Sequence, residues 1–398
     1  MKRIVIVGAS AGGLATAEAL RRKGFEGTVT LVGDELGVPY DRPPLSKQLL
    51  SGEWEPARLA LRDEDQIAQL RLDLRLGTRA TGLDTGARIV TLADGRALDY
   101  DAVVIATGVR PRRLSGCEDW AGLHVLRTLS DALGLQARLR EGGRLVIVGA
   151  GFIGAEVAAT SRALGVEVTM LEAAPSVLAE AIGERGGQFL IDLHRDRGVA
   201  VRTSAVVSEI VNSDGRVLGV RLADNSVVPA DDVLVAIGSL PNTEWMEASG
   251  LPVDNGLVCD EFGVAAPGVY GVGDVARWYS PSLGASVRIE HRTNASEHGM
   301  TVAHHILNPD EPQPFVSLPY FWSDQYDTRI QAFGHLRGHD EAVVVQDDAA
   351  QGRLFIVYRR GDRVAGVLAA GKPPRFLRQW RGLIAAETDF DVAMASSE

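Results

Sequence analysis

A glycine-rich turn that occurs twice constrains this chain more than any other feature. The run of β-branched residues and the glycine turn that ends it occupy residues 2–14 in the first copy and 144–154 in the second. An alanine-rich amphipathic segment follows each turn. The glycines permit a tight turn and let backbone N–H groups approach a pyrophosphate at the positive end of a helix. About 20 residues after each turn, as in dinucleotide-binding units, a second strand ends in acid. Two dinucleotide sites in one chain indicate a flavoprotein that also binds a nicotinamide.

Later segments indicate how the domains follow one another. Residues 100–108 and 231–238 are typical of buried strands that end in glycine, and 269–276 of a third strand-to-helix junction with an acid at the helix start. A domain with a single dinucleotide site would not need all three. We therefore predict an α/β protein of two Rossmann-like domains, the first split around the second, with a small α+β C-terminal domain after a proline-rich linker. The expected boundaries are 1–110 with 238–315, then 111–237, then 316–398.

The charge and the cysteines limit the classes of partner and site. A formal charge of −11 at pH 7 argues against nucleic-acid binding, which needs a basic surface. No apolar run is long enough to span a bilayer, and the N-terminus leads straight into a strand, so we expect a cytoplasmic protein with no membrane partner. Cys117 and Cys259 are too few and too far apart to predict a disulfide framework or a metal cluster.

A proline-rich stretch after the first acid, PYDRPPLSK at residues 39–47, carries a specific resemblance. Together with GASAGG, VGDE, ATGVRPR, LRTLSDA, VGAGFIGAE, AIGSLPN, GVGDVARW, RIEH…NA and FWSDQY, it resembles the single-component FAD-dependent NADH–ferredoxin reductases. This family includes putidaredoxin, rubredoxin and dioxygenase ferredoxin reductases. The resemblance covers nearly the whole chain. It implies a glutathione-reductase-like architecture with FAD in the split domain, NADH in the inserted domain, and a C-terminal interface domain.

The resemblance also implies where FAD is bound. It places Gly12 at the pyrophosphate, Asp34 near the adenosine ribose and Asp274 at the ribityl chain. The residue types agree for Asp34, an acid in the ribose-binding place, and for Asp274, at a helix N-terminus. The alternative for Asp274 is that it only caps its helix. Arg42 and Lys47 are expected along the flavin, and Ala80 and Arg127 at the adenine end. The other positions expected to bind a cofactor are Gly8, Ser10, Gly13, Glu35, Thr107, Gly108, Gly149, Gly151, Ile153, Gly154, Gly238, Gly273 and Arg292.

Lys47 and Glu156 are the expected catalytic pair. Glu156 follows the second glycine turn, and we place it on the first turn of its helix, where its charge suits the helix dipole. The resemblance implies that Lys47, beside the reactive edge of the flavin, pairs with Glu156 at the nicotinamide pocket. The alternative is an ordinary helix-start carboxylate and a solvated lysine.

Glu172 predicts that NADH is the electron donor. An acid at the end of this strand accepts hydrogen bonds from the ribose 2′-OH of NAD, whereas NADP-binding proteins place arginine nearby. Residues 173–179 contain no arginine.

The absence of a redox cysteine early in the sequence narrows the class of flavoprotein further. Disulfide reductases of this architecture carry a redox cysteine beside the flavin, but no cysteine precedes Cys117, which we interpret as a passive small residue. Electrons would then pass directly to an outside acceptor, which the resemblance implies is a small acidic iron–sulfur ferredoxin. Many relatives have an aromatic residue where this chain has Arg292. His291 and His298 are interpreted as packing or hydrogen-bonding residues, because no metal-ligand spacing surrounds them, and no metal is expected.

A basic segment near the C-terminus predicts where an acidic ferredoxin would bind. Helical spacing puts Arg375, Arg378 and Arg381 on one face, with the apolar Phe376, Leu377 and Trp380 toward the body, and Arg292 would add to the patch. The alternative is a solvated helix face. Two other functions stay open. An NADH-sensing flavoprotein akin to apoptosis-inducing factor is disfavoured by the missing basic tails and targeting segment, and an NADH oxidase or peroxidase by the missing cysteine.

Overall fold

The computed structural model describes residues 1–116, 120–316 and 318–396. It divides into two compact units, and each is described by itself. The first unit contains Met1–Asp41, Ala57–Arg110 and Ser239–Ser317, and the second contains Arg42–Pro56, Pro111–Gly238 and Leu318–Glu398.

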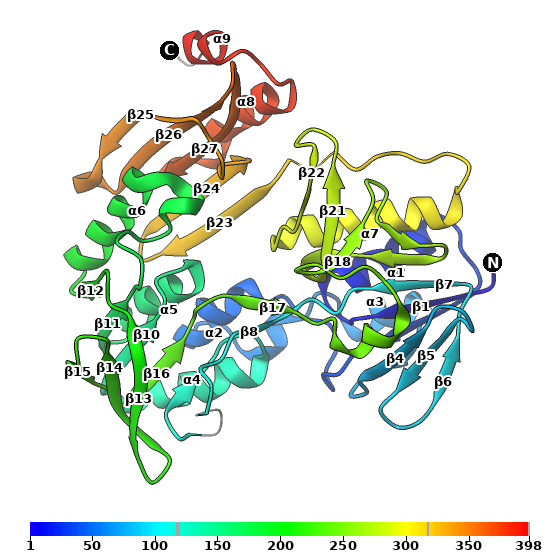
Figure 1. Ribbon diagram of the computed structural model, residues 1–398, viewed down its shortest axis with the longest axis horizontal. Coiled ribbons are helices and arrows are strands. Elements are labelled where there is room, and N and C mark those ends of the chain that lie inside the picture. The colour runs from blue at the N-terminus through cyan, green and yellow to red at the C-terminus, as the bar shows by residue number, and fades with distance from the viewer. Residues whose placement is uncertain (117–119, 317, 397–398) are drawn as a thin grey trace. The chain divides into compact units, whose positions relative to one another are not determined.

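The first unit is built on a six-stranded sheet with the order β19-β20-β7-β1-β2-β3. Its strands β1 and β7 are labelled in Figure 1. All neighbours in the sheet pair in parallel except β19 and β20, which are antiparallel. Side chains of β1 and β7 are almost all buried, as expected for a parallel sheet covered on both faces. The strands and the two helices packed on each other beside them are β1 (Arg3–Val7), β2 (Thr28–Val32), β3 (Asp73–Arg75), β7 (Ala102–Ile105), β19 (Val264–Ala266), β20 (Val269–Gly271), α1 (Ala11–Arg22) and α7 (Arg292–Leu307).

Smaller elements complete the first unit. A three-stranded antiparallel meander and a second three-stranded sheet flank the main sheet. Their strands are β4 (Ala80–Asp84), β5 (Ile89–Leu92), β6 (Ala97–Asp99), β18 (Leu257–Cys259), β21 (Ala276–Ser280) and β22 (Ala285–Val287). The short helices are η2 (Pro56–Leu59), which begins at the last residue of a second-unit segment, α3 (Glu64–Gln69), η3 (Glu244–Ser249) and η4 (Gly273–Val275). Strands β8 (Val109–Pro111) and β17 (Ser239–Pro241) pair with each other.

The second unit repeats the parallel arrangement. Its five-stranded sheet has the order β12-β11-β10-β16-β9, all parallel, and an antiparallel three-stranded sheet follows β12 in the chain. The strands are β9 (Leu123–His124), β10 (Arg144–Val148), β11 (Glu167–Leu171), β12 (Ala200–Arg202), β13 (Val207–Ser213), β14 (Arg216–Leu222), β15 (Val227–Pro229) and β16 (Asp232–Val235). The helices are η1 (Pro43–Ser46), α2 (Gln48–Ser51), α4 (Leu129–Glu141), α5 (Phe152–Ala163) and α6 (Ala179–Asp196).

The C-terminal part of the second unit is a five-stranded antiparallel sheet with the order β23-β24-β27-β26-β25. Successive residues of β26 point to opposite faces: Leu354 and Ile356 join the core formed with α6, while Phe355 and Val357 join the core beneath α8. The sheet is therefore buried on both faces. Its elements are β23 (Tyr320–Gln325), β24 (Thr328–Gly334), β25 (Glu341–Asp348), η5 (Ala349–Gln351), β26 (Arg353–Arg360), β27 (Arg363–Ala370), α8 (Pro374–Ala385) and α9 (Phe390–Ala395).

Two sequence-based expectations differ from this arrangement. Residues 42–56, which we placed in the first domain, belong to the second unit, because η1 and α2 pack against α4 and α5. The expected helix after β20 is a single 3₁₀ turn, η4, followed by strand β21. Residues 276–280 alternate between buried and more exposed, a pattern that suits a strand. The assignment of one cofactor to each domain stays a prediction.

Within the described residues, no helix is long and apolar enough to cross a membrane. The expected cytoplasmic location stays a prediction.

Candidate active site

The two glycine turns are fixed by the chain itself at their first and last glycines. Gly8 has φ +122° and Gly149 has φ +99°, which favours glycine. A Cβ at Gly8 would lie 2.1 Å from the Ala106 carbonyl oxygen, and one at Gly149 would lie 2.4 Å from that of Ala236. Gly13 and Gly154 are equally constrained, because an added Cβ would lie 1.9 Å from Gly8 O and 2.3 Å from Gly149 O, respectively.

The helix starts after these turns fit a pyrophosphate. Among the described residues, an added Cβ at Gly151 would meet nothing within 4 Å, so protein packing does not explain this glycine. Ser10 and Gly151 precede α1 and α5 without a side-chain cap in the described part of the chain, and neither first turn contains an acid. By contrast, Thr128 caps α4 through the N–H of Asp131. An anionic group at α1 and α5 would bind the N–H groups left by the missing caps.

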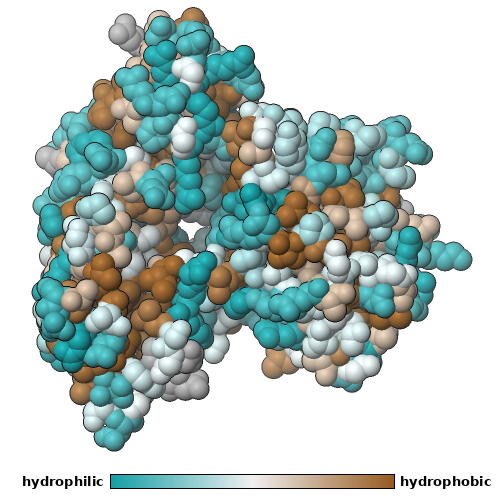
Figure 2. Space-filling model, viewed as in Figure 1, coloured by the Kyte–Doolittle hydropathy of each residue, from teal (hydrophilic) through white to brown (hydrophobic). Residues whose placement is uncertain are grey.

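Apolar side chains surround the second turn. Ile153, on the first turn of α5, is 46% exposed, and Ile237, after β16, is 37% exposed. Figure 2 shows apolar residues (brown) gathered over the part of the surface where β10, β11 and β16 lie in Figure 1. In the first turn, Gly12 holds the place that Ile153 holds in the second. Gly12 is buried, and a Cβ there would lie 2.8 Å from Val272 Cγ1. Close packing against Val272 and against Ala295 of α7 therefore explains Gly12, and its expected place at a pyrophosphate stays a prediction.

The expected ribose and adenine residues of the first unit follow β2 and begin β4. Asp34, with a side chain 58% exposed, forms an ion pair with Arg79 at 3.4 Å. The Glu35 carboxylate accepts a hydrogen bond of 2.5 Å from the Tyr40 hydroxyl. Ala80 is the buried first residue of β4.

Hydrogen bonds fix the turn after β7 and the turn at η4. The Thr107 hydroxyl donates to the Asn242 carbonyl at 2.8 Å, and the Asn242 amide donates back to the Thr107 carbonyl at 2.8 Å. Gly108 and Gly273 both have positive φ, of +66° and +72°. The Gly273 N–H points at His298 Nδ1 across 3.4 Å, so His298 acts as a hydrogen-bonding residue there. Asp274 lies in η4, and its carbonyl accepts from Arg288.

Arg292 is the first residue of α7 and is engaged within the first unit. Its Nε donates to Asp41 Oδ1 at 2.6 Å, and its Nη1 donates to Ser296 Oγ at 2.6 Å. Because the Asp41 carboxylate balances this guanidinium, Arg292 would add less net positive charge to the predicted ferredoxin-binding patch than an isolated arginine would.

Three expected cofactor residues of the second unit lie in hydrogen-bonded loop segments. Arg42 Nη1 donates to the Arg127 carbonyl at 2.6 Å, and the Arg127 N–H donates to Asp131 at 3.0 Å. Gly238, with φ +96°, accepts a backbone hydrogen bond from Arg112.

Glu172 is held over the second glycine turn. One carboxylate oxygen accepts the Ala150 N–H at 3.0 Å, and the other accepts the Ala174 N–H at 2.9 Å. A carboxylate has about four acceptor positions, so two remain for a ligand. The glycine turn thus fixes the orientation of the acid that we expect to select NADH.

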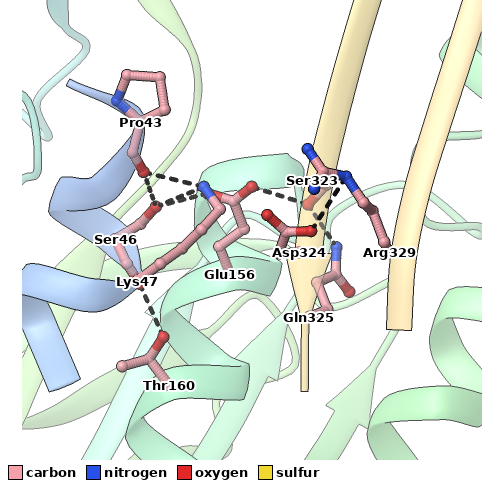
Figure 3. Close-up of polar contacts among 9 residues, drawn as sticks. All are labelled: Pro43, Ser46, Lys47, Glu156, Thr160, Ser323, Asp324, Gln325 and Arg329. Atoms are coloured by element: carbon pink, nitrogen blue, oxygen red, sulfur yellow. Dashed lines mark hydrogen bonds and ion pairs between the residues drawn. The ribbon is translucent and has the colours of Figure 1, made fainter. Parts of the chain in front are cut away.

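Lys47 and Glu156 form a buried ion pair (Figure 3). Lys47 Nζ lies 2.6 Å from Glu156 Oε2, and their side chains are only 10% and 4% exposed. The lysine is therefore not solvated. Glu156 is the fifth residue of α5, in the second turn and not the first as we expected, because the helix begins at Phe152. The catalytic role of the pair stays a prediction.

Comparisons with known proteins identify the family of this chain. The family described as pyridine nucleotide-disulphide oxidoreductase matches residues 2–299, and the family described as reductase C-terminal matches residues 320–397. Rhodocoxin reductase of Rhodococcus erythropolis is 37% identical over 98% of this chain and 94% of its own length. Putidaredoxin reductase of Pseudomonas putida is 38% identical over 94% of this chain and 89% of its own length. The chain belongs to the ferredoxin reductase family.

A solved structure supports the same family assignment. In the covalent putidaredoxin reductase–putidaredoxin complex, a chain 35% identical to this one superimposes with a TM-score of 0.93, covering 100% of this chain and 99% of that chain. The resemblance and the fold class predicted from the sequence, two Rossmann-like domains of glutathione-reductase type plus a C-terminal domain, are confirmed. The family implies a flavin and a pyridine nucleotide as cofactors.

The structure of the reductase reveals site residues that sequence reasoning missed. Glu156 Oε1 accepts a hydrogen bond of 2.8 Å from Ser323, and Oε2 accepts one of 2.5 Å from Ser46 (Figure 3). Thr160 of α5 anchors Ser46 by donating to its carbonyl at 2.8 Å. Ser323 belongs to the FWSDQY motif, where Ser323 and Gln325 alternate along a strand. The only signal in the sequence was a run of three polar residues, 323–325, directly after three aromatic residues of the same strand.

Cys259 is not among the residues of the candidate site. Cys259 is buried as a free thiol in the core of the first unit, and burial raises its pKa, which disfavours the reactive thiolate. Cys117, interpreted as a passive residue, lies outside the described residues.

Proposed function

We propose that the chain is an FAD-dependent NADH–ferredoxin reductase for a haem-thiolate monooxygenase or a ring-hydroxylating dioxygenase. The observation that carries the proposal is the pair of uncapped helix starts behind glycine turns, one in each unit. When bound, FAD accepts a hydride from NADH and passes electrons singly to an iron–sulfur protein. The reductase in the covalent complex has putidaredoxin as its partner, and we propose a small acidic ferredoxin for this chain.

The residues of the chain would bind the two cofactors and orient them. The first-unit turn at Gly8–Gly13 would hold the FAD pyrophosphate, and the second-unit turn at Gly149–Gly154 that of NADH. Glu172 would accept the ribose 2′-OH. The Lys47–Glu156 pair would fix the position of a cation and a carboxylate at the nicotinamide, without water between them.

Steady-state reduction of cytochrome c by NADH tests this function. We expect turnover to depend strongly on an added ferredoxin from the same cell. Equal rates with and without ferredoxin would favour the NADH-sensing flavoprotein. Rapid consumption of oxygen or peroxide without ferredoxin would favour an NADH oxidase or peroxidase.

NADH is expected to be preferred over NADPH by at least about tenfold in kcat/KM. The fixed Glu172 carboxylate would face the NADPH 2′-phosphate, and juxtaposed like charges cost up to several kcal/mol, while about 1.4 kcal/mol corresponds to tenfold. Glu172→Ala should narrow the ratio, mainly by improving NADPH. Glu167→Ala, at the exposed start of the same strand, is the matched control and should leave the ratio unchanged. Equal use of both nucleotides by the unaltered protein would contradict this prediction.

The basic face of α8 supports a docking site for the ferredoxin on the second unit. Arg375, Arg378 and Arg381 are exposed, whereas Leu377 and Trp380 are each 1% exposed and pack on the C-terminal sheet. Residues 374–385 form the helix that the spacing predicted, with the arginines outward. A partner rich in carboxylates would meet a local concentration of positive charge on a chain whose net charge is negative.

Replacing Arg375 and Arg378 with glutamate is expected to raise KM for ferredoxin about tenfold or more, since reversed charges repel the acidic partner. KM for NADH should not change. Added salt should slow ferredoxin-linked turnover of the unaltered protein while NADH-to-ferricyanide turnover barely responds. The matched control replaces two exposed arginines elsewhere in the second unit, Arg140 and Arg216, with glutamate. An unchanged ferredoxin KM in the α8 variant, or an equal rise in the control, would move the docking site elsewhere.

A further inference from the structure

A continuous chain of buried hydrogen bonds leads from α6 through β23 to the Lys47–Glu156 pair. His194 Nδ1 lies 2.9 Å from the Tyr326 hydroxyl, and its Nε2 lies 3.0 Å from Gln325 Oε1. Gln325 Nε2 donates to Ser323 Oγ at 3.1 Å, and Ser323 Oγ donates to Glu156 Oε1 at 2.8 Å. Ser323 and Gln325 are fully buried, and His194 is 1% exposed.

The donors in this chain all point toward the carboxylate. Because Gln325 Oε1 only accepts, His194 must donate from Nε2, and its Nδ1 then accepts from Tyr326. Burial lowers the pKa of His194 to about 4, so the ring is neutral and this tautomer holds at neutral pH. Ser323 uses its only proton on Glu156. Hydrogen bonds aligned in one direction polarise one another, which strengthens the last bond onto the charged group.

The arrangement leaves the pair little freedom. Glu156 Oε1 is occupied by Ser323, which turns Oε2 toward Ser46 and Lys47. Lys47 Nζ in turn has three acceptors for its three protons: Glu156 at 2.6 Å, the Pro43 carbonyl at 3.0 Å and Ser46 Oγ at 3.3 Å. Without the Ser323 donor, Oε1 would be buried without a hydrogen bond, and rotation of the carboxylate would move the acceptor on which Lys47 depends.

We propose that Ser323 is a positioning residue for the Lys47–Glu156 pair, held in place by Gln325 and His194. The C-terminal sheet thereby takes part in NADH-dependent flavin reduction through β23, besides any part it has in partner docking. This inference rests on the proposed function, because it assigns to the pair a role in flavin reduction. Ser323 itself acts through Glu156.

The first measurement is the limiting rate of flavin reduction by NADH in anaerobic stopped-flow experiments on the FAD-loaded protein. Ser323→Ala should lower this rate about tenfold, since hydrogen bonds to charged groups are the stronger class. The dissociation constant for NADH should change less than about twofold, because the nucleotide contacts elsewhere stay intact. Ser323→Thr keeps the hydroxyl and should recover most of the rate.

Ser161→Ala is the matched control. Ser161 lies on α5 like Glu156, is fully buried, and has a hydroxyl with no hydrogen-bond partner among the described residues. Removing this hydroxyl makes the same chemical change on the helix that carries Glu156, without touching the hydrogen bonds that lead from His194 to Glu156. The flavin reduction rate of this variant should equal that of the unaltered protein.

The second measurement reads the position of Lys47 without turnover. The protein has four lysines, Lys2, Lys23, Lys47 and Lys372, so acetylation of each by an amine-reactive ester can be followed by mass spectrometry. Lys47 should react slowly in the unaltered protein and in Ser161→Ala, and several-fold faster in Ser323→Ala. Lys2 and Lys23, which are exposed, are the internal references and should react equally in all variants.

The outcomes separate the two levels of the proposal. If Ser323→Ala changes neither the rate nor Lys47 acetylation, or if Ser161→Ala changes both equally, Ser323 does not position the pair. If Lys47→Met leaves flavin reduction unchanged, the role of the pair fails, while acetylation still reports whether Ser323 positions it. In the Lys47→Met background, Ser323→Ala should slow reduction no further. An equal slowing there would mean that Ser323 acts independently of the pair.

Discussion

Replacing Lys47 with methionine is expected to slow flavin reduction by NADH about a hundredfold while FAD stays bound. Loss of the cation that is held by three acceptors removes the fixed charge that we propose lies at the nicotinamide, and misplacement by about 1 Å can cost roughly 10²-fold. The same change should destabilise the second unit by about 3–5 kcal/mol, because it leaves the Glu156 carboxylate buried without its counter-ion. Stopped-flow spectroscopy and chemical denaturation measure the two effects separately.

A double variant distinguishes catalysis from stability. Lys47→Met combined with Glu156→Gln replaces the buried charges by neutral groups of similar size, and this should restore most of the lost stability. The flavin reduction rate should stay low, since neither charge is present. If the double variant recovered the rate together with the stability, the pair would have a structural role only. Single changes whose rate effects simply add would show two independent residues.

Acid is expected to destabilise the protein well above the range where carboxylates titrate, because of His298. Its ring stacks on Trp278 with centroids 3.8 Å apart and also contacts Phe315, and burial lowers its pKa to about 3. In the unfolded protein this histidine has a pKa of about 6.5, so between pH 6.5 and 3 it is protonated in the unfolded state and neutral in the folded state. Stability contributed by the neutral ring is therefore complete above about pH 6.5 and is lost as pH falls toward 3. At pH 4.5 the loss is about 3 kcal/mol.

His298→Phe tests this linkage through the slope of stability against pH. Phenylalanine keeps a ring on Trp278 but cannot bind a proton, so proton uptake on unfolding between pH 6.5 and 4.5 should fall by about one. His194 and His335, whose pKa values are each lowered to about 4 by burial, and His305, whose pKa burial also lowers, should contribute to the remaining histidine part of the slope. Denaturation monitored by circular dichroism at several pH values gives the measurement. The same slope in the variant and the unaltered protein would rule out His298 as the source.

Much of the fold could be predicted because its signals are local. The turns at Gly8 and Gly149 need positive φ and close carbonyl contacts, which only glycine satisfies, so the motif itself identifies the strand and helix on either side. Helix α8 was found from the spacing of its arginines and of the buried Leu377 and Trp380. The junction after β20 was not, because Gly-Asp at a strand end is equally compatible with a helix and with the single 3₁₀ turn that precedes β21.

The site was less accessible from the sequence. The Lys47–Glu156 pair came from a resemblance, since residues 109 positions apart cannot be joined by spacing alone. Ser323 was missed because its role depends on how β23 packs on α5, a tertiary contact that the polar run at 323–325 does not reveal. The segment at 42–56 was assigned to the wrong unit for the same reason: its packing partners, α4 and α5, lie far along the chain.

The two faces of the C-terminal sheet set different limits on making chimeric reductases. One face, through Leu354 and Ile356, shares a core with α6, and edge strand β23 supplies Ser323 to Glu156. Exchanging the whole domain for that of a relative would therefore require matching residues on α5 and α6. The outer side of α8 makes no such demand, because its arginines point to solvent while Trp380 anchors the helix. If the partner docks on α8, as proposed above, recognition of a new redox partner could be grafted onto this helix surface, residue by residue, without redesigning the interior beneath it.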